Sequence, residues 1–214
     1  MSKLAKRPLA SGPVRYEIVG PSDRPTGLML AVNYEEAPVP QHYYVADWFN
    51  VTARDLDVII AFGNIDHGER LRSKIEVVFP FFYFVKQLWR SSREFHGTLR
   101  DFVNTLRLQP IIGSVAELVG DKFQILKANN VVMILSGTET LLDFFYISPK
   151  DLWSKPRKGE PLELEGVVRV MLSPTLLLGF LDACEPIAIQ LSERFKEHLR
   201  EEEPNESLES QYAK

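Results

Sequence analysis

The chain has 214 residues, a hydrophobic content of 45% and a formal net charge of −4. This length accommodates one large domain or two small ones, and the hydrophobic content is ordinary for a globular chain that buries a core. The mild negative charge argues against a general nucleic-acid binder, because such proteins are usually basic.

The N-terminal part of the chain predicts a leader followed by a hairpin. Residues 1–13 contain lysine, arginine, prolines and a glycine, and we expect a disordered leader there. Val14–Val19 and Leu28–Tyr34 have the composition of strands, and turn-forming residues separate them. We expect residues 14–42 to form a hairpin or wide loop that joins the edge of the sheet following it.

Residues 43–107 predict a first module of three strands and a helix. The strands are expected at Trp48–Thr52, Leu56–Ile65 and Leu71–Phe79. Pro80 fits the first turn of a helix, where its missing N–H costs nothing. From Phe81 to Leu106 apolar residues recur at steps of three and four, which predicts one long helix with an apolar face on the sheet.

Residues 108–127 are expected to be a linker with a helical turn at Ser114–Leu118, since they contain Pro110, Gly113 and Gly120. Residues 128–195 then predict a second module. Its strands are expected near residues 130–134, 138–147 and 162–172, with a long hairpin loop at 148–161. Ser173 and Pro174 are typical of a helix start, and the acidic tail at 196–214 is expected to fray.

The residue spacing indicates that the two modules repeat one unit. Phe62 and Phe144 match at a spacing of 82 (144 − 62 = 82), and Ile65 and Ile147 match at the same spacing. Such internal similarity sets the architecture. We therefore predict an α+β protein of two repeated modules, each an antiparallel sheet packed on one long helix, that pair as a pseudo-dimer. The apolar stripes of the two helices do not superimpose when the prolines that precede them are aligned.

A family resemblance rests on Tyr43–Gly63 and Lys74–Trp89, and on Leu141–Ile147 and Val167–Phe180 in the second copy. Their order resembles a small, uncharacterised bacterial and archaeal family of single-module proteins. That family is more distantly similar to the SecB-type export chaperones, in which an antiparallel sheet is backed by long helices. The resemblance implies a SecB-like fold and the holding of unfolded chains on apolar grooves.

Catalytic and metal-binding motifs are not evident. None of the four histidines, which include His67 and His96, has a metal-ligand spacing to another histidine or cysteine. Asp66-His67 falls in a predicted turn, where a solvated role is expected, and Asp55 and Asp57 fit turn capping. We expect no enzyme, no cofactor and no metal. An enzyme with an unrecognised site remains an alternative.

An aromatic cluster at Phe79–Phe84, followed by Trp89, is the main interaction signal. Successive helical residues differ by about 100°, so these side chains cannot all face one sheet. Either they start a core helix, or some of them meet a partner. We assign Phe82, Phe84, Trp89 and Val103 to a protein-interaction surface for a protein or an unfolded peptide, in a homo- or hetero-oligomer. A structural subunit of a bacterial or phage-encoded assembly is the alternative.

The expected cellular location depends on three features: disulfides, membrane-spanning segments and secretion signals. The single cysteine, Cys184, allows no intramolecular disulfide and is expected to be a buried, inert thiol. We find no run of about 18 apolar residues and no secretion signal, so we expect a cytoplasmic protein without membrane insertion.

Overall fold

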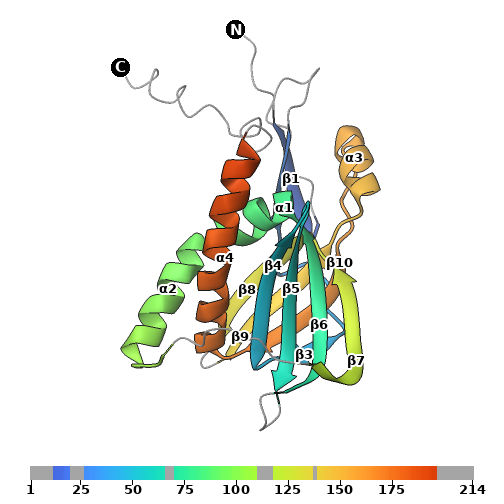
Figure 1. Ribbon diagram of the computed structural model, residues 1–214. Coiled ribbons are helices and arrows are strands. Elements are labelled where there is room, and N and C mark those ends of the chain that lie inside the picture. Colours follow the sequence, from blue (N-terminus) through green and yellow to red (C-terminus); the bar gives the residue numbers. More distant parts are fainter. Residues whose placement is uncertain (1–11, 20–26, 66–69, 110–117, 137–138, 197–214) are drawn as a thin grey trace, which may run out of the picture.

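The structure is a computed structural model, and it describes residues 12–19, 27–65, 70–109, 118–136 and 139–196. The predicted α+β class is confirmed, since helices and mostly antiparallel strands make up the described chain (Figure 1). The strands are β1 Val14–Val19, β2 Gly27–Val32, β3 Tyr43–Val45, β4 Trp48–Arg54, β5 Asp57–Ile65, β6 Leu71–Pro80, β7 Leu118–Lys127, β8 Asn130–Ser136, β9 Glu139–Tyr146 and β10 Glu165–Leu172. The helices are α1 Phe81–Tyr83, the π-helix η1 Phe84–Arg90, α2 Ser91–Thr105, α3 Pro149–Lys158 and α4 Pro174–Arg194.

Two four-stranded sheets form the body of the molecule. Sheet I has the order β4-β5-β6-β7, and sheet II has the order β3-β10-β9-β8. Three strands of each sheet are antiparallel, as predicted, but the fourth is parallel to its neighbour: β7 to β6, and β3 to β10. The sheets are therefore mixed and not purely antiparallel.

The chain crosses between the sheets twice, each time within two residues. Ala46 N–H donates to Met171 O of sheet II at 3.0 Å, and the next N–H, of Asp47, donates to Gly63 O of sheet I at 3.1 Å. The strand β3 thus belongs to one sheet and its continuation β4 to the other. β7 and β8 make the same crossing in the opposite direction, at Ala128 and Asn129.

The inner faces of the sheets pack on each other. Phe62 and Phe79 of sheet I lie against Phe144 of sheet II, with ring centroids 5.9 and 6.5 Å apart. Phe180 of α4 contacts Phe62 as well, with a centroid distance of 5.6 Å. One apolar core therefore spans both sheets, as expected where each strand buries alternate apolar side chains.

The long helices lie at one side of the two sheets, against each other (Figure 1). We predicted that each helix would cover the sheet of its own module, and the structure differs. η1 and α2, which follow β6 of sheet I in the chain, contact β8 of sheet II, whereas α4 contacts β4 of sheet I and, less extensively, β9 of its own sheet II. The reason is that the inner faces cover much of one another, so the helices contribute side chains to the shared core mainly from beside the edge strands β4 and β8.

The sequence predicts that the hairpin β1-β2 joins the edge of sheet I. This prediction is wrong, because the hairpin forms its own two-stranded sheet. It packs on sheet II, where Val14 and Tyr16 form a second apolar cluster with Phe145 and Ile147. Phe145 points to the face opposite the inward-facing Phe144, so the outer face of β9 also carries a large apolar side chain that needs a cover.

Three further elements depart from the sequence prediction. Residues 118–127, assigned to a linker, form the edge strand β7, and Pro80 ends β6 instead of lying in the helix. The predicted loop at 148–161 contains α3, which Gly159 ends in a left-handed conformation with φ 72°. The predicted turn at Ser114–Leu118 lies mainly outside the described residues, as do the leader, Asp66-His67 and the acidic tail.

One described helix, α4, is long and apolar enough to cross a membrane by length and composition alone. Its apolar window is 56% buried inside the molecule, which is the pattern of a core helix. Cys184 lies in this helix and is buried, as predicted.

Candidate binding groove beside strand β8

The four residues assigned to an interaction surface lie in or against the main core. Phe84, Trp89 and Val103 are buried among the residues that join the two sheets to the helices. Phe82 is half-buried, and its ring packs edge-on against Tyr83 at a centroid distance of 5.5 Å. The interaction role of these residues stays a prediction, but within this chain three of them have little surface left to offer.

Their burial follows from the position of the helix. η1 contacts α4 on one side and β8 on another, so it buries more than one face. The expectation that one sheet could not accommodate all these aromatics was therefore sound, and residues 130–194 supply the additional neighbours. Trp89 also contacts the ring of His96 one to two turns along, at a centroid distance of 5.9 Å.

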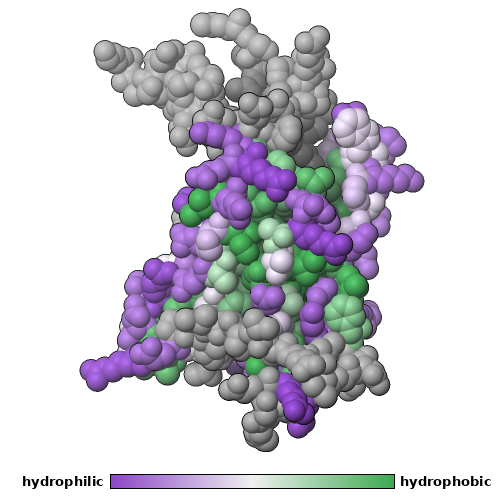
Figure 2. All heavy atoms as spheres, in the orientation of Figure 1, coloured by the Kyte–Doolittle hydropathy of each residue, from purple (hydrophilic) through white to green (hydrophobic). Residues whose placement is uncertain are grey.

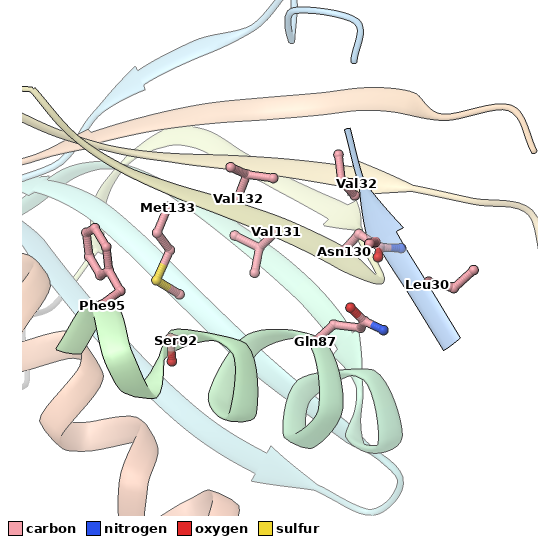
Figure 3. A pocket seen from close by; sticks show the side chains of 10 residues that line it. Leu30, Val32, Gln87, Ser92, Phe95, Asn130, Val131, Val132 and Met133 are labelled. Carbon is pink, nitrogen blue, oxygen red and sulfur yellow. The ribbon is translucent and has the colours of Figure 1, made fainter. Parts of the chain in front are cut away.

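A groove of about 310 Å³ runs beside this helix (Figure 3). Three segments that are far apart in the sequence form its walls: β2, the η1–α2 helix and β8. Phe95 and Met133 lie at one end and Asn130 at the other, as the side chains in Figure 3 show. The lining residues are Leu30, Ala31, Val32, Gln87, Ser92, Phe95, Asn130, Val131, Val132 and Met133.

β8 is the edge strand of sheet II and pairs only with β9 among the described strands. Its sequence, Asn130–Ser136, contains five consecutive apolar residues and no charge. Val131, Met133 and Leu135 are half-buried against the main core, and Val132 packs toward the second cluster. In general, the free side of an edge strand has N–H and C=O groups that can pair with a further strand.

Two polar side chains of the groove are held by neighbours. The Ser92 hydroxyl donates to Trp89 O at 2.9 Å, and the Asn130 amide donates to Asn129 Oδ1 at 3.0 Å. The groove thus combines apolar walls with a few fixed polar groups, as ligand sites commonly do. In the described part of the chain, no group of three or more His, Cys, Asp or Glu side chains is arranged to hold a metal ion.

An ionisable cluster joins α2 to α4. His96 Nε2 lies 2.8 Å from Asp182 Oδ1, and Arg100 Nη2 donates to the same oxygen at 2.6 Å. Sequence reasoning missed this cluster, because its members come from helices 82 to 86 residues apart and no local motif links them. We interpret it as a polar contact that holds the two helices together.

A second cluster lies on the outer face of sheet II. Arg169 donates two hydrogen bonds to the buried Asp143 carboxylate, both at 2.6 Å, and Tyr34 donates a third at 2.9 Å. These bonds raise the pKa of Arg169 well above its ordinary value, and burial followed by the bond to Asp143 raises the pKa of Tyr34. The segment after β2 is thereby fastened onto the sheet. This segment lies so close to β10 that a Cβ atom added to Gly166 would be only 3.0 Å from Pro40 Cα.

The outer face of sheet I differs, since it leaves large apolar side chains exposed. Phe123 and Ile125 of β7 are exposed on this face, and Leu56 is exposed in the turn between β4 and β5. Figure 2 shows hydrophobic surface gathering over this sheet, bordered by hydrophilic residues. Exposed apolar patches of this kind mark interaction sites in many proteins.

Comparison of the chain with protein-family models, with curated proteins and with solved structures gave no match.

Proposed function

We propose that the chain is a non-enzymatic binding protein that takes an extended, apolar peptide segment at the groove beside β8, as a SecB-like chaperone or adaptor in the cytoplasm. The observation that carries the proposal is the apolar edge of β8 lying along a groove with apolar walls. A bound segment would add as a strand to sheet II, so main-chain hydrogen bonds would provide affinity with little dependence on sequence.

The dimensions of the groove suit this occupant. β8 has 7 residues, and a strand rises about 3.3 Å per residue, so a segment beside it would extend over roughly 20 Å. Alternate side chains of that segment would enter the groove, where Val131, Met133 and Phe95 offer apolar contacts. The remaining side chains would point to solvent, which fits a site that accepts many clients.

We propose further that the fold arose by tandem duplication with exchanged edge strands. Asp47 and Asn129 are the first residues after the two crossings, and they are 82 positions apart (129 − 47 = 82). Each uses its side-chain oxygen in the same way: Asp47 Oδ1 accepts from Ile65 N at 2.7 Å, and Asn129 Oδ1 accepts from Ile147 N at 2.9 Å. Ile65 and Ile147 are separated by the same 82 positions, which supports the duplication.

The π-helix offers a reason why the offset between the two helical stripes changes along their length. A π turn accommodates one additional residue within a helix. Buried positions of the two helices match at a spacing of 93 before η1 ends and at 92 afterwards. The first set pairs Phe84, Val85 and Leu88 with Leu177, Leu178 and Leu181, and the second pairs Ser92, His96 and Leu99 with Cys184, Ala188 and Leu191.

Binding of a labelled apolar peptide tests the proposed function. The probe is an unstructured peptide of about ten residues with alternating valines, long enough to cover a strand. Ala31→Arg should obstruct the groove and weaken binding about tenfold, a loss of roughly 1.4 kcal/mol. Ala31 is exposed, so the fold should be kept. Ala53→Arg, at an exposed position on β4, is the matched control and should bind as the parent does.

The chaperone version predicts that the parent chain suppresses aggregation of an unfolded client and that Ala31→Arg loses this effect. Equal peptide affinity of the parent and of Ala31→Arg would refute the groove as the site. Suppression of aggregation that survives Ala31→Arg would move the client to another surface.

A permanent subunit of a larger assembly is the second candidate, and the exposed apolar face of sheet I favours it. Ile125→Asp would place a charge in that face and should reduce the mass measured by light scattering if the face joins subunits. Thr52→Asp adds the same charge at an exposed position on β4 and serves as the control. Masses that match for the parent, Ile125→Asp and Thr52→Asp would remove this candidate.

A further inference from the structure

The helix α3 carries an exposed tryptophan outside the groove. α3 is inserted between β9 and β10, and it projects at one end of the molecule (Figure 1). Trp153 is 68% exposed, whereas Trp48 and Trp89 are 5% and 6% exposed. The opposite side of α3 is anchored, because Pro156 is buried and Leu152 packs on the second apolar cluster. Trp153 therefore points away from the body on a helix that is held in place.

The exposed face of α3 is cationic. The Arg157 guanidinium lies over the Trp153 ring, 3.8 Å from its centroid. Lys150, Trp153 and Arg157 are spaced i, i+3 and i+7, so they share one face of the helix. Lys155 is bound to Asp151 and Glu163, but among the described residues no carboxylate forms an ion pair with Lys150 or Arg157. Within the described residues, two cations without acidic partners thus share a helix face with an indole ring.

This combination fits an acidic peptide with apolar side chains. Tryptophan and arginine are the residues that most often dominate binding at protein surfaces. The stacked guanidinium keeps its donors available at the rim of the ring, where carboxylates can accept them. The whole chain is acidic, with a net charge of −4, so α3 is a local reversal of the charge.

We propose that the face formed by Lys150, Trp153 and Arg157 binds the acidic segment 197–214 of the same chain. This segment contains Glu197, Glu201, Glu202, Glu203, Glu206 and Glu209 against Arg200 and Lys214, and it also has Leu199, Leu208 and Tyr212. The glutamates complement the cations of α3, and the apolar side chains complement the face of Trp153. The contact would cover an otherwise solvated aromatic ring.

The position at which the segment begins allows the contact. α4 ends at Arg194 at the same end of the molecule as α3 (Figure 1). Residues 197–214 span up to roughly 60 Å when extended, which exceeds the width of a domain of this size. Tethering gives an effective concentration on the order of millimolar, so weak charge contacts are enough to hold the segment.

Acrylamide quenching of tryptophan fluorescence in the full chain tests the proposal, because Trp153 is the exposed one of the three tryptophans. Neutralising the segment with Glu201→Gln, Glu202→Gln and Glu203→Gln should raise the quenching constant about twofold, as should 1 M salt, at which the Debye length is about 3 Å. The matched control is Glu139→Gln, Glu185→Gln and Glu193→Gln, which changes the net charge equally at exposed positions. It should leave the quenching constant unchanged.

A second variant tests the contact from the side of α3. Lys150→Glu reverses one charge of the face without altering the ring contact of Arg157, and it should raise quenching as well. If the glutamine variant and Lys150→Glu both quench like the parent, the segment does not bind α3. If protection of Trp153 is lost on tenfold dilution, the segment comes from a second copy, and the same-chain contact is refuted.

Discussion

Phe62 of β5 and Phe144 of β9 meet across the interior of the molecule, with ring centroids 5.9 Å apart and an angle of 56° between the rings. Both are fully buried. Sheet I and sheet II therefore share one core, and neither inner face is a separate surface. In the duplication that we propose, these two residues are equivalent, and a contact between equivalent residues lies on the pseudo-twofold axis.

Removing either ring should destabilise both sheets together. We expect Phe62→Ala and Phe144→Ala each to lower the free energy of unfolding by about 3–5 kcal/mol, the usual cost of truncating a buried phenylalanine. Because the rings contact each other, the double variant should lose less than the two single losses combined, by about 0.5–3 kcal/mol. Urea unfolding of the four chains measures this coupling, and additive losses would contradict a shared core.

The buried ion pair of Asp143 and Arg169 gives a second prediction. The Asp143 side chain is completely buried, so Arg169→Met leaves its carboxylate with Tyr34 as its remaining described side-chain donor. Removal of one partner of a buried pair costs about 3–5 kcal/mol. Tyr34→Phe is the matched control, because it removes one hydrogen bond to the carboxylate and should cost less, about 1.5–3 kcal/mol. Urea unfolding that gives equal losses for the two variants would contradict this order.

The secondary structure could largely be read from the sequence. The patterns at Val14–Val19, at the strand ending in Ile65 and at the helix beginning at Pro174 agree with β1, β5 and α4, because each depends on a local alternation of buried and exposed side chains. The sequence also contains signals for both ends of α3: Ser148 before Pro149 at its start and Gly159 after its last turn. The prediction for residues 148–161 is instead a long hairpin loop.

The partners of these elements could not be read in the same way. A periodic pattern reports that a face is buried, but not what buries it. The crossing at Ala46 and Asp47 depends on acceptors at Met171 and Gly63, which no local motif identifies. The groove was missed for the same reason: the apolar run of β8 is typical of an interior strand, and only the order of the strands in sheet II places it at the edge.

Burial of Cys184 gives a prediction about pH. Desolvation raises the pKa of this thiol well above its ordinary value of 9.0. The folded chain then retains a proton that the unfolded chain releases, so the contribution to stability is full below pH 9.0 and declines as the pH rises above it. The decline is at most about 1.4 kcal/mol per pH unit. Urea unfolding of the parent and of Cys184→Ala at pH 8 to about 10.5 measures the difference in slope, and parallel slopes would contradict it.

The π turn leads to a prediction from a single deletion. If η1 holds one additional residue, deleting the exposed Arg90 should convert it to a regular α-helix and keep Ser92 and Leu99 facing the core. α4 has no π turn, so deleting the exposed Glu185 from it cannot be compensated in this way. It rotates the following residues by about 100° and turns Leu191 away from the core. We expect the Arg90 deletion to unfold cooperatively near the parent midpoint and the Glu185 deletion to lose its cooperative transition, as measured by circular dichroism on heating. Equal damage from the two deletions would mean that the π turn is an integral part of the helix and not an accommodated insertion.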